Sequence, residues 1–180
     1  FETHKKMISS EIIKIASNTK YVGLKNIFTH KSSVRNHLCG DTIKLELIVK
    51  KFKIKSLRYE SESCILCEAS ASLLANKVHN LYLKDLKKDL ILFKDFKKKK
   101  VDVLPKRFKE FKNLLNGNMS RINCVILPIE GLIKALGQIK NIIEMIQTAK
   151  DTPEAKAKLI VRLEVSEKQA ESILAMPLKK

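Results

Sequence analysis

Three cysteines stand in separate short motifs whose side chains could meet at one ion. Cys39 belongs to Cys39-Gly40-Asp41, whereas Cys64 and Cys124 each precede a run rich in apolar residues. Thiolates bind zinc and iron well, and Asp41 adds a hard oxygen ligand. Gly40 allows a tight turn, so the side chains on either side of it can face the same ion. The residue types and their order therefore indicate metal or sulfur chemistry.

The same cysteines are also compatible with a purely structural role, because free cysteine often behaves as a small buried apolar residue. Cys64 and Cys67 form a single Cys-x-x-Cys pair, and the second pair of a zinc finger is missing. We expect Cys67 to pack in the core rather than contact an ion. We expect His37, like His79, to be solvated or hydrogen-bonded rather than a ligand.

Three sequence blocks surround these cysteines in a fixed order, and each combines a cysteine with a recognisable flank. They are His37-Leu38-Cys39-Gly40-Asp41, Ser63-Cys64 followed by Ala69-Ser70-Ala71-Ser72, and Arg121-Ile122-Asn123-Cys124-Val125. In this order, over residues 7–136, they resemble the U-type iron–sulfur scaffold family, which includes NifU-like, IscU and SufU proteins. The Lys-rich insert between the second and third blocks resembles the SufU branch.

This resemblance implies a site and partners. It implies that Cys39, Asp41, Cys64 and Cys124 hold an iron–sulfur cluster or Zn²⁺, and that Cys124 or Cys64 accepts persulfide sulfur from a cysteine desulfurase. It also implies that clusters pass to recipient apoproteins, which makes the chain a scaffold or sulfur-transfer protein rather than an enzyme. Asn123 stands where IscU-type proteins carry a histidine, and the chaperone-binding segment of IscU is absent.

Composition limits the remaining function classes. The formal net charge is +17, but the lysines are dispersed, with one tight run at 97–100, and aromatic residues make up 6%. Without aromatic side chains interleaved among the lysines for base stacking, we expect no specific nucleic-acid binding. No apolar run approaches 18 residues, so no membrane span is expected. Four cysteines without a disulfide framework and no signal-peptide core favour the cytoplasm.

Local patterns predict an α+β fold, with a small antiparallel sheet and helices packed on one face. Clean alternation predicts a strand over 42–49 and a hairpin partner over 53–59. Helices are expected over 9–17, 69–81, 83–93 and 108–115, and a further helix begins near Cys124. Cys64 and Cys124 would then lie at helix starts, where unpaired amides and the helix dipole favour the thiolate.

The last fifty residues change character and form a predicted helical tail. One long amphipathic helix continues past Glu130, and Pro153 and the capping box Ser166-Glu167-Lys168-Gln169 mark two more helices. This stretch resembles the helical module near the coiled-coil tip of the A subunits of DNA gyrase and topoisomerase IV, which implies packing or dimerisation and not DNA cleavage. We therefore divide the chain into a non-native leader (1–6), a scaffold domain (7–138) and a truncated tail (139–180).

The tail carries an apolar stripe that we expect to be exposed and unpaired in the monomer, where it would promote self-association. Its members are Ile142, Ile146, Leu159 and Leu163. Three functions thus remain open at this point. The first is an iron–sulfur scaffold or zinc-dependent sulfur acceptor. The second is a helical dimerisation module, as a fragment of the A chain of a type II DNA topoisomerase, and the third is a basic nucleic-acid-associated protein with structural cysteines.

Overall fold

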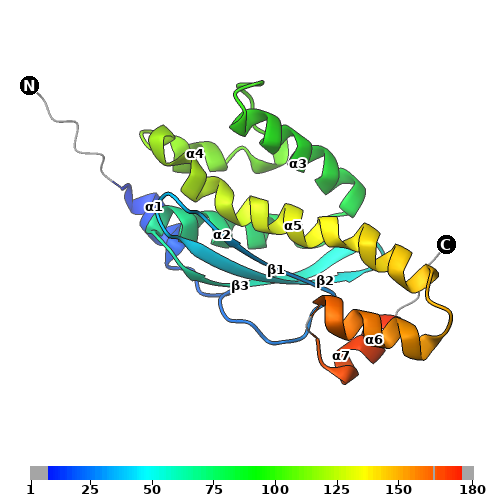
Figure 1. Cartoon of the computed structure of the whole chain (residues 1–180). Coiled ribbons are helices and arrows are strands. Elements are labelled where there is room, and N and C mark those ends of the chain that lie inside the picture. Colours follow the sequence, from blue (N-terminus) through cyan, green and yellow to red (C-terminus); the bar gives the residue numbers. More distant parts are fainter. Residues whose placement is uncertain (1–7, 164, 176–180) are drawn as a thin grey trace, which may run out of the picture.

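A three-stranded antiparallel sheet carries most of the helices on one face, and the last two helices lie beyond one end of it (Figure 1). The computed structural model describes residues 8–163 and 165–175, and for 138–145, 162 and 163 it describes the backbone alone. The strands β1 (His30–Arg35), β2 (Thr42–Lys50) and β3 (Lys53–Glu62) are adjacent in chain order. The two helices packed most closely on the sheet are α2 (Ile65–Val78) and α5 (Ile122–Gln147). The expected α+β architecture is confirmed.

The central strand β2 supplies much of the core. Ile43, Leu45 and Leu47 are at most 1% exposed and alternate with residues of the opposite face. A strand whose apolar side chains recur every second residue buries one face. Both expected strands are present, and β3 extends three residues beyond the predicted end at Tyr59. A register shift between Ile48 and Val49 interrupts the pairing of β2 with β3.

The edge strand β1 was not predicted from the sequence. Val34 is its single strongly apolar residue, so the alternation that marks a half-buried strand is missing. Its inner face is instead partly polar, and the buried Ser32 hydroxyl donates a 2.7 Å hydrogen bond to the carbonyl of Gly131 on α5. A contact with a helix 99 residues away thus satisfies this side chain.

The first two helices differ in how closely they match the prediction. Ser9 caps α1 (Ser10–Ala16), since its hydroxyl accepts a hydrogen bond from the backbone N–H of Ile12. Helix α2 begins at Ile65, four residues before the predicted start, and ends at Val78 rather than at residue 81. Its periodicity is weak because the helix is buried on nearly every side, including Ser70 and Ser72.

The Lys-rich insert forms a small helical layer above α5. Helix α3 (Leu83–Lys97) runs four residues beyond its predicted end, and the expected helix over 108–115 divides into the short turn η1 (Lys106–Phe108) and α4 (Phe111–Leu115). Phe93, Phe108 and Phe111 hold the layer together with edge-to-face ring contacts at centroid distances of 5.3 to 5.9 Å.

Helix α5 crosses the sheet at close range. It begins at Ile122, directly after the short turn η2 (Met119–Arg121), and it carries Pro128 in its interior. Because proline lacks an N–H, the carbonyl of Cys124 loses its helical donor. One turn later a Cβ on Gly131 would lie 2.8 Å from Leu45 Cδ1, so glycine allows the helix to approach the sheet.

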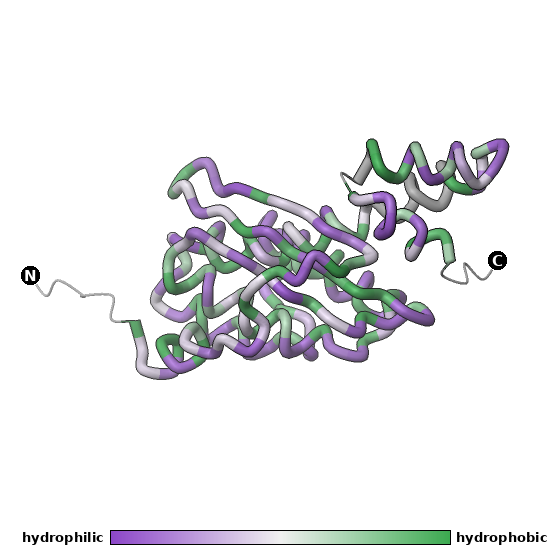
Figure 2. The backbone as a smooth tube through the Cα atoms, turned by 90° about the horizontal axis from the view of Figure 1, so that it is seen from below, coloured by the Kyte–Doolittle hydropathy of each residue, from purple (hydrophilic) through white to green (hydrophobic). Residues whose placement is uncertain are grey.

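The C-terminal helices α6 (Thr152–Leu163) and α7 (Glu167–Leu174) form a hairpin at one end of the molecule (Figures 1 and 2). Leu159 is fully buried there, in a cluster with Phe28, Ala170 and Ile173. The expected exposure of Leu159 is therefore wrong, because Phe28 from the N-terminal half covers it. Ile146 packs on the same cluster, while the side chains of Ile142 and Leu163 lie outside the described residues. The capping box at Ser166 is confirmed.

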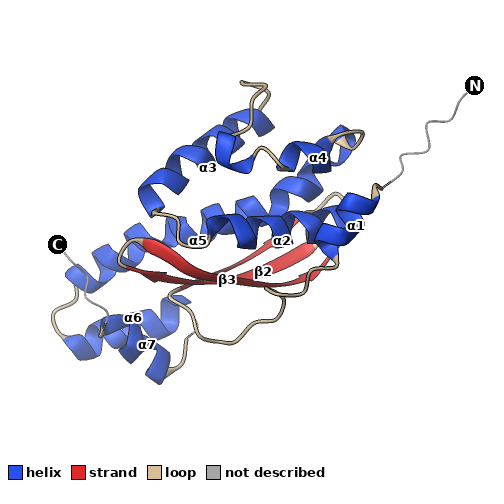
Figure 3. Ribbon diagram, turned by 180° about the vertical axis from the view of Figure 1, so that it is seen from behind, coloured by secondary structure: helices blue, strands red, loops and turns tan. Residues whose placement is uncertain are grey.

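A loop over residues 18–29 runs below the sheet, on the side opposite α2 and α5, and leads toward the hairpin (Figure 3). Phe28 in this loop belongs to the apolar cluster of the hairpin. The buried carboxylate of Glu46 accepts hydrogen bonds from the backbone N–H groups of Lys25 and Asn26, at 2.9 and 3.0 Å. Arg58 Nε donates to the carbonyl of Gly23 at 2.7 Å. Within the described residues, no helix has both the length and the apolar character required to cross a membrane.

Candidate metal centre

Three of the predicted ligands meet at one end of the sheet. The Sγ atoms of Cys39 and Cys124 are 3.7 Å apart, although 85 residues separate them in sequence. One carboxylate oxygen of Asp41 joins them, and the three ligand atoms all lie within 4.8 Å of one another. Cys39 is exposed, whereas Asp41 and Cys124 are buried. Their placement gives one accessible and two protected donors around a common point.

The hairpin turn between β1 and β2 positions the first two donors. Asn36 N–H donates to the carbonyl of Asp41, and Gly40 N–H donates to the carbonyl of Asn36, both at 2.8 Å. Gly40 has a φ of 79°, a left-handed conformation that glycine adopts without steric cost. The turn therefore holds Cys39 at its tip and Asp41 at its base, as the Cys-Gly-Asp sequence predicts.

The Asp41 carboxylate divides its two oxygens between different tasks. Oδ1 accepts a hydrogen bond from the backbone N–H of Cys64 at 3.2 Å. Oδ2 is buried and has no hydrogen-bond partner among the described residues. A buried carboxylate oxygen without a partner is costly, and a cation bound beside it would remove that cost. The donor set thus fits a metal ion with mixed sulfur and oxygen ligands.

Cys64 lies beside the group rather than within it. It is the N-cap residue of α2 and is partly exposed, and its side chain makes no capping hydrogen bond. Its sulfur is not within 4.8 Å of all three other ligand atoms. Cys64 is nevertheless close enough to help raise the pKa of Cys124.

Burial controls the protonation of the inner cysteines. It raises the pKa of Cys124 to about 12, and the negative charge of Cys64 and the hydrogen bond with Cys39 act in the same direction. The expected preference for the thiolate at this helix start is therefore wrong without a cation, because desolvation outweighs the dipole. Burial also raises the pKa of Cys67 to about 12, and this residue packs in the core, as predicted.

A cation that the sequence analysis did not select lies next to the thiols. Arg121 is in η2, three residues before Cys124. Partial burial tends to lower the pKa of its guanidinium, but the charges of Cys64, Cys124 and Asp41 outweigh this effect and raise it. The sequence signal that could have identified Arg121 is its position, since it is a basic residue one turn before the candidate ligand Cys124. His37 and His79 are both exposed, and neither belongs to the ligand group within the described residues.

Comparison with known proteins agrees with this geometry. Residues 7–117 match the family model of the NifU-like N terminal domain, and the chain belongs to this family. The match includes Cys39, Asp41 and Cys64, whereas Cys124 follows it. The U-type resemblance of the sequence is therefore confirmed.

Solved structures with the same fold extend the similarity beyond the matched segment. A NifU-like protein (N-terminal) from Brucella abortus has a TM-score of 0.66 at 20% identity and covers 76% of this chain and 96% of its own. A putative iron–sulfur cluster assembly scaffold protein for the SUF system from Fervidobacterium islandicum AW-1 has a TM-score of 0.63 at 19% identity, covering 72% and 96%. At these identities the structures establish the fold alone.

Two curated relatives match shorter parts of the chain. The iron-sulfur cluster assembly scaffold protein IscU of Thermotoga maritima is 32% identical over 74 residues, which are 41% of this chain. The chain spans about half of that relative, 52% of its length. The DNA gyrase A subunit of Brachyspira hyodysenteriae is 36% identical over 89 residues, or 49% of this chain and 10% of the gyrase chain.

Proposed function

We propose that this protein is an iron–sulfur cluster assembly scaffold. The observation that carries the proposal is the group formed by Cys39, Asp41 and Cys124. Within this group, the buried Oδ2 of Asp41 has no hydrogen-bond partner among the described residues. Cys64 is the fourth donor. A set of three sulfurs and one oxygen suits iron or zinc, and the harder oxygen ligand favours release of a cluster compared with four thiolates. Membership of the NifU-like family supports the same function.

Sulfur would arrive as a persulfide on a cysteine desulfurase. A thiolate of this chain attacks the outer sulfur of that persulfide, a new S–S bond forms, and the desulfurase leaves as its own thiolate. Cys64 and Cys124 are the proposed acceptors. Cys64 is the more accessible of the two, because it is partly exposed whereas Cys124 is buried. Recipient apoproteins would then take the assembled cluster, in the cytoplasm.

A zinc-dependent sulfur acceptor is a second candidate, because the same mixed donor set also suits Zn²⁺. Three donors meet at one point, and Cys64 beside them would supply the fourth ligand of a tetrahedral site. When bound, the ion would keep the sulfur ligands deprotonated despite the burial that raises the pKa of Cys124 to about 12. Cys39, Asp41, Cys64 and Cys124 would hold it, and Arg121 would lie beside the anionic ligands.

A gyrase-like dimerisation module and a nucleic-acid-associated protein both have less support. The gyrase similarity covers one tenth of the gyrase chain, and the apolar side chains of Leu159 and Ile173 pack against Phe28 within this protein. That contact leaves less apolar surface for a dimer. A nucleic-acid-associated protein would explain the charge of +17 but assigns no role to the three converging donors.

Metal analysis and cluster reconstitution test the proposal. We expect the anaerobically prepared chain either to bind one Zn²⁺ or to assemble a cluster from ferrous iron, cysteine and a cysteine desulfurase. Cluster assembly is measured by visible absorbance, and cluster transfer is measured with an apo-ferredoxin as the recipient. Cys39→Ser and Cys124→Ser should each lose the stoichiometric ion, because each removes a donor from the group.

Cys67→Ala is the matched control, since it removes a buried cysteine that lies outside the ligand group. It should lower stability by about 1–2 kcal/mol while leaving the metal content unchanged. A Cys39→Ser/Cys124→Ser double variant that still binds one ion would show that the site is elsewhere. An iron–sulfur spectrum distinguishes the scaffold from the zinc protein.

A further inference from the structure

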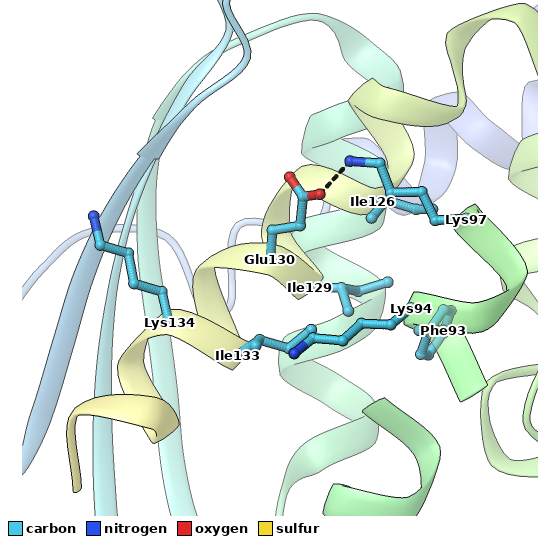
Figure 4. A pocket seen from close by; sticks show the side chains of 8 residues that line it. All are labelled: Phe93, Lys94, Lys97, Ile126, Ile129, Glu130, Ile133 and Lys134. Carbon is cyan, nitrogen blue, oxygen red and sulfur yellow. Dashed lines mark hydrogen bonds and ion pairs between the residues drawn. The ribbon is translucent and has the colours of Figure 1, made fainter. Parts of the chain in front are cut away.

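An apolar hollow of about 180 Å³ lies between α3 and α5, on the helical layer (Figure 4). Its floor is made of Phe93, Ile126 and Ile129, each at most 4% exposed, and Ile133 borders it. None of the four predicted ligands lines it. A hollow of this size accepts one or two apolar side chains, which is too little for a stable interface without polar contacts around it.

Lysines dominate the rim of this hollow. Lys97 pairs with Glu130 across one end (Figure 4). Lys134 Nζ donates to the carbonyl of Ser33 at 2.8 Å. Lys94 is exposed and forms no ion pair with any acidic residue that the structure describes. The single carboxylate at the rim is thus already neutralised, and an excess of positive charge remains beside the apolar floor.

The positive surface continues along α3. Lys87, Ile91 and Lys94 recur at spacings of four and three residues, so they share one face of the helix. Ile91 is 51% exposed on that face. The surrounding segment, residues 84–112, carries twelve Lys or Arg against five Asp or Glu. This face therefore combines exposed cations with an exposed apolar side chain, and its Lys94 also lines the hollow.

We propose that the groove between α3 and α5 binds an acidic amphipathic helix of a partner protein. An apolar side chain of that helix fills the hollow, and its carboxylates lie against Lys87 and Lys94. Charge complementarity would steer the encounter, and burial of the apolar side chain would hold the complex. A nucleic acid would use the lysines but leave the hollow empty. The proposal is independent of the metal centre, because the two sites share no residue.

A synthetic peptide of about 18 residues tests this surface, since shorter helices are marginal in water. It carries leucine at helical spacings on one face and glutamate on both flanks. Its control has the same composition with the leucines dispersed. Titration into the ¹⁵N-labelled chain, followed by NMR, should shift resonances of α3 and α5. Lys94→Glu and Ile133→Trp should each weaken binding at least about fivefold, the first by charge reversal and the second by filling the hollow.

Lys14→Glu, a charge reversal on α1, is the matched control and should change affinity less than about twofold. Metal binding should be unchanged in all three variants. Absence of saturable binding, shifts confined to other elements, or equal binding of the dispersed peptide would overturn the proposal. Unchanged affinity in Ile133→Trp with reduced affinity in Lys94→Glu would also overturn it, because the face would then be a general polyanion site. Heparin serves as the polyanion probe for that outcome.

Discussion

The Asp41 carboxylate and the backbone N–H of Cys64 are joined by a hydrogen bond of 3.2 Å. The residue at the base of the β1–β2 turn therefore also anchors the start of α2. A single side chain connects two of the three segments that make up the candidate metal centre. Its second oxygen is buried and has no hydrogen-bond partner among the described residues, so it would be available to a bound ion.

Two substitutions at Asp41 should separate these roles. Asp41→Asn keeps an oxygen acceptor for Cys64 N–H but loses the charge, whereas Asp41→Ala loses both. We expect Asp41→Ala to reduce the free energy of unfolding by about 1 kcal/mol relative to Asp41→Asn. Both should slow cluster transfer more than they lower metal content, because three sulfur donors remain. Transfer assays and metal analysis measure this, and unchanged transfer rates would exclude Asp41 from the mechanism.

Gly131 should be intolerant of a side chain. A Cβ there would lie 2.8 Å from Leu45 Cδ1 and 3.3 Å from Val34 Cγ2, so α5 would have to move away from the sheet. We expect Gly131→Ala to cost about 1–3 kcal/mol in urea denaturation. At Gly137, on the same helix, an added Cβ would meet no described atom within 4 Å beyond the helix's own backbone and adjacent residues, so Gly137→Ala should instead stabilise by up to about 1 kcal/mol. Equal effects at the two positions would contradict the close approach at Gly131.

Stability should fall in acid because of His30. Burial lowers the pKa of His30 from 6.5 to about 4, so the folded chain keeps the ring neutral while the unfolded chain protonates it. The part of the free energy of unfolding that depends on the neutral His30 ring is fully present above pH 6.5, and it is lost as the pH falls from 6.5 to about 4. This difference corresponds to roughly 3 kcal/mol.

The test compares urea unfolding of the native chain and His30→Gln across that range of pH. Carboxylates contribute to the slope in both chains, so their effect cancels in the difference. The native chain should lose more stability than the variant as the pH falls. Parallel pH profiles would show that His30 is not desolvated in the folded chain.

Removal of the C-terminal hairpin tests the proposed division of the chain. Truncation after residue 140 should preserve metal binding, because every proposed ligand precedes residue 125. It should also uncover Phe28, now 8% exposed, and lower the free energy of unfolding by about 2 kcal/mol. Phe28→Ala in the full chain should produce a similar loss with the hairpin present. Loss of the ion on truncation would show that the two parts form one domain.

The strands β2 and β3 and the Cys-Gly-Asp turn could be predicted because their determinants are local. Apolar residues alternate through β2, and Gly40 occupies a left-handed turn position. β1 could not be found in this way, since Ser32 is buried only because Gly131 on α5 accepts its hydrogen bond. The start of α2 was misplaced for a related reason. Burial on nearly every side removes the periodicity by which a helix is recognised.

The candidate site was predictable in its members but not in its electrostatics. Sequence motifs selected Cys39, Asp41 and Cys124, which the fold brings together. The burial that raises the pKa of Cys124, and the proximity of Arg121, follow from how η2 and α5 pack against the hairpin turn. Similarly, the cover that Phe28 provides for Leu159 depends on a loop held by Glu46, which no local pattern reveals.

An ion bound between Cys39 and Cys124 would cross-link positions 85 residues apart. Such a link closes a long loop and restricts the unfolded ensemble far more than the folded chain, so most of its effect is entropic. Loading the site would then raise the melting temperature, and emptying it would return that conformational freedom to the chain. Release of a cluster to a recipient would thus be coupled to a loosening of its carrier, and thermal stability would report how full the site is.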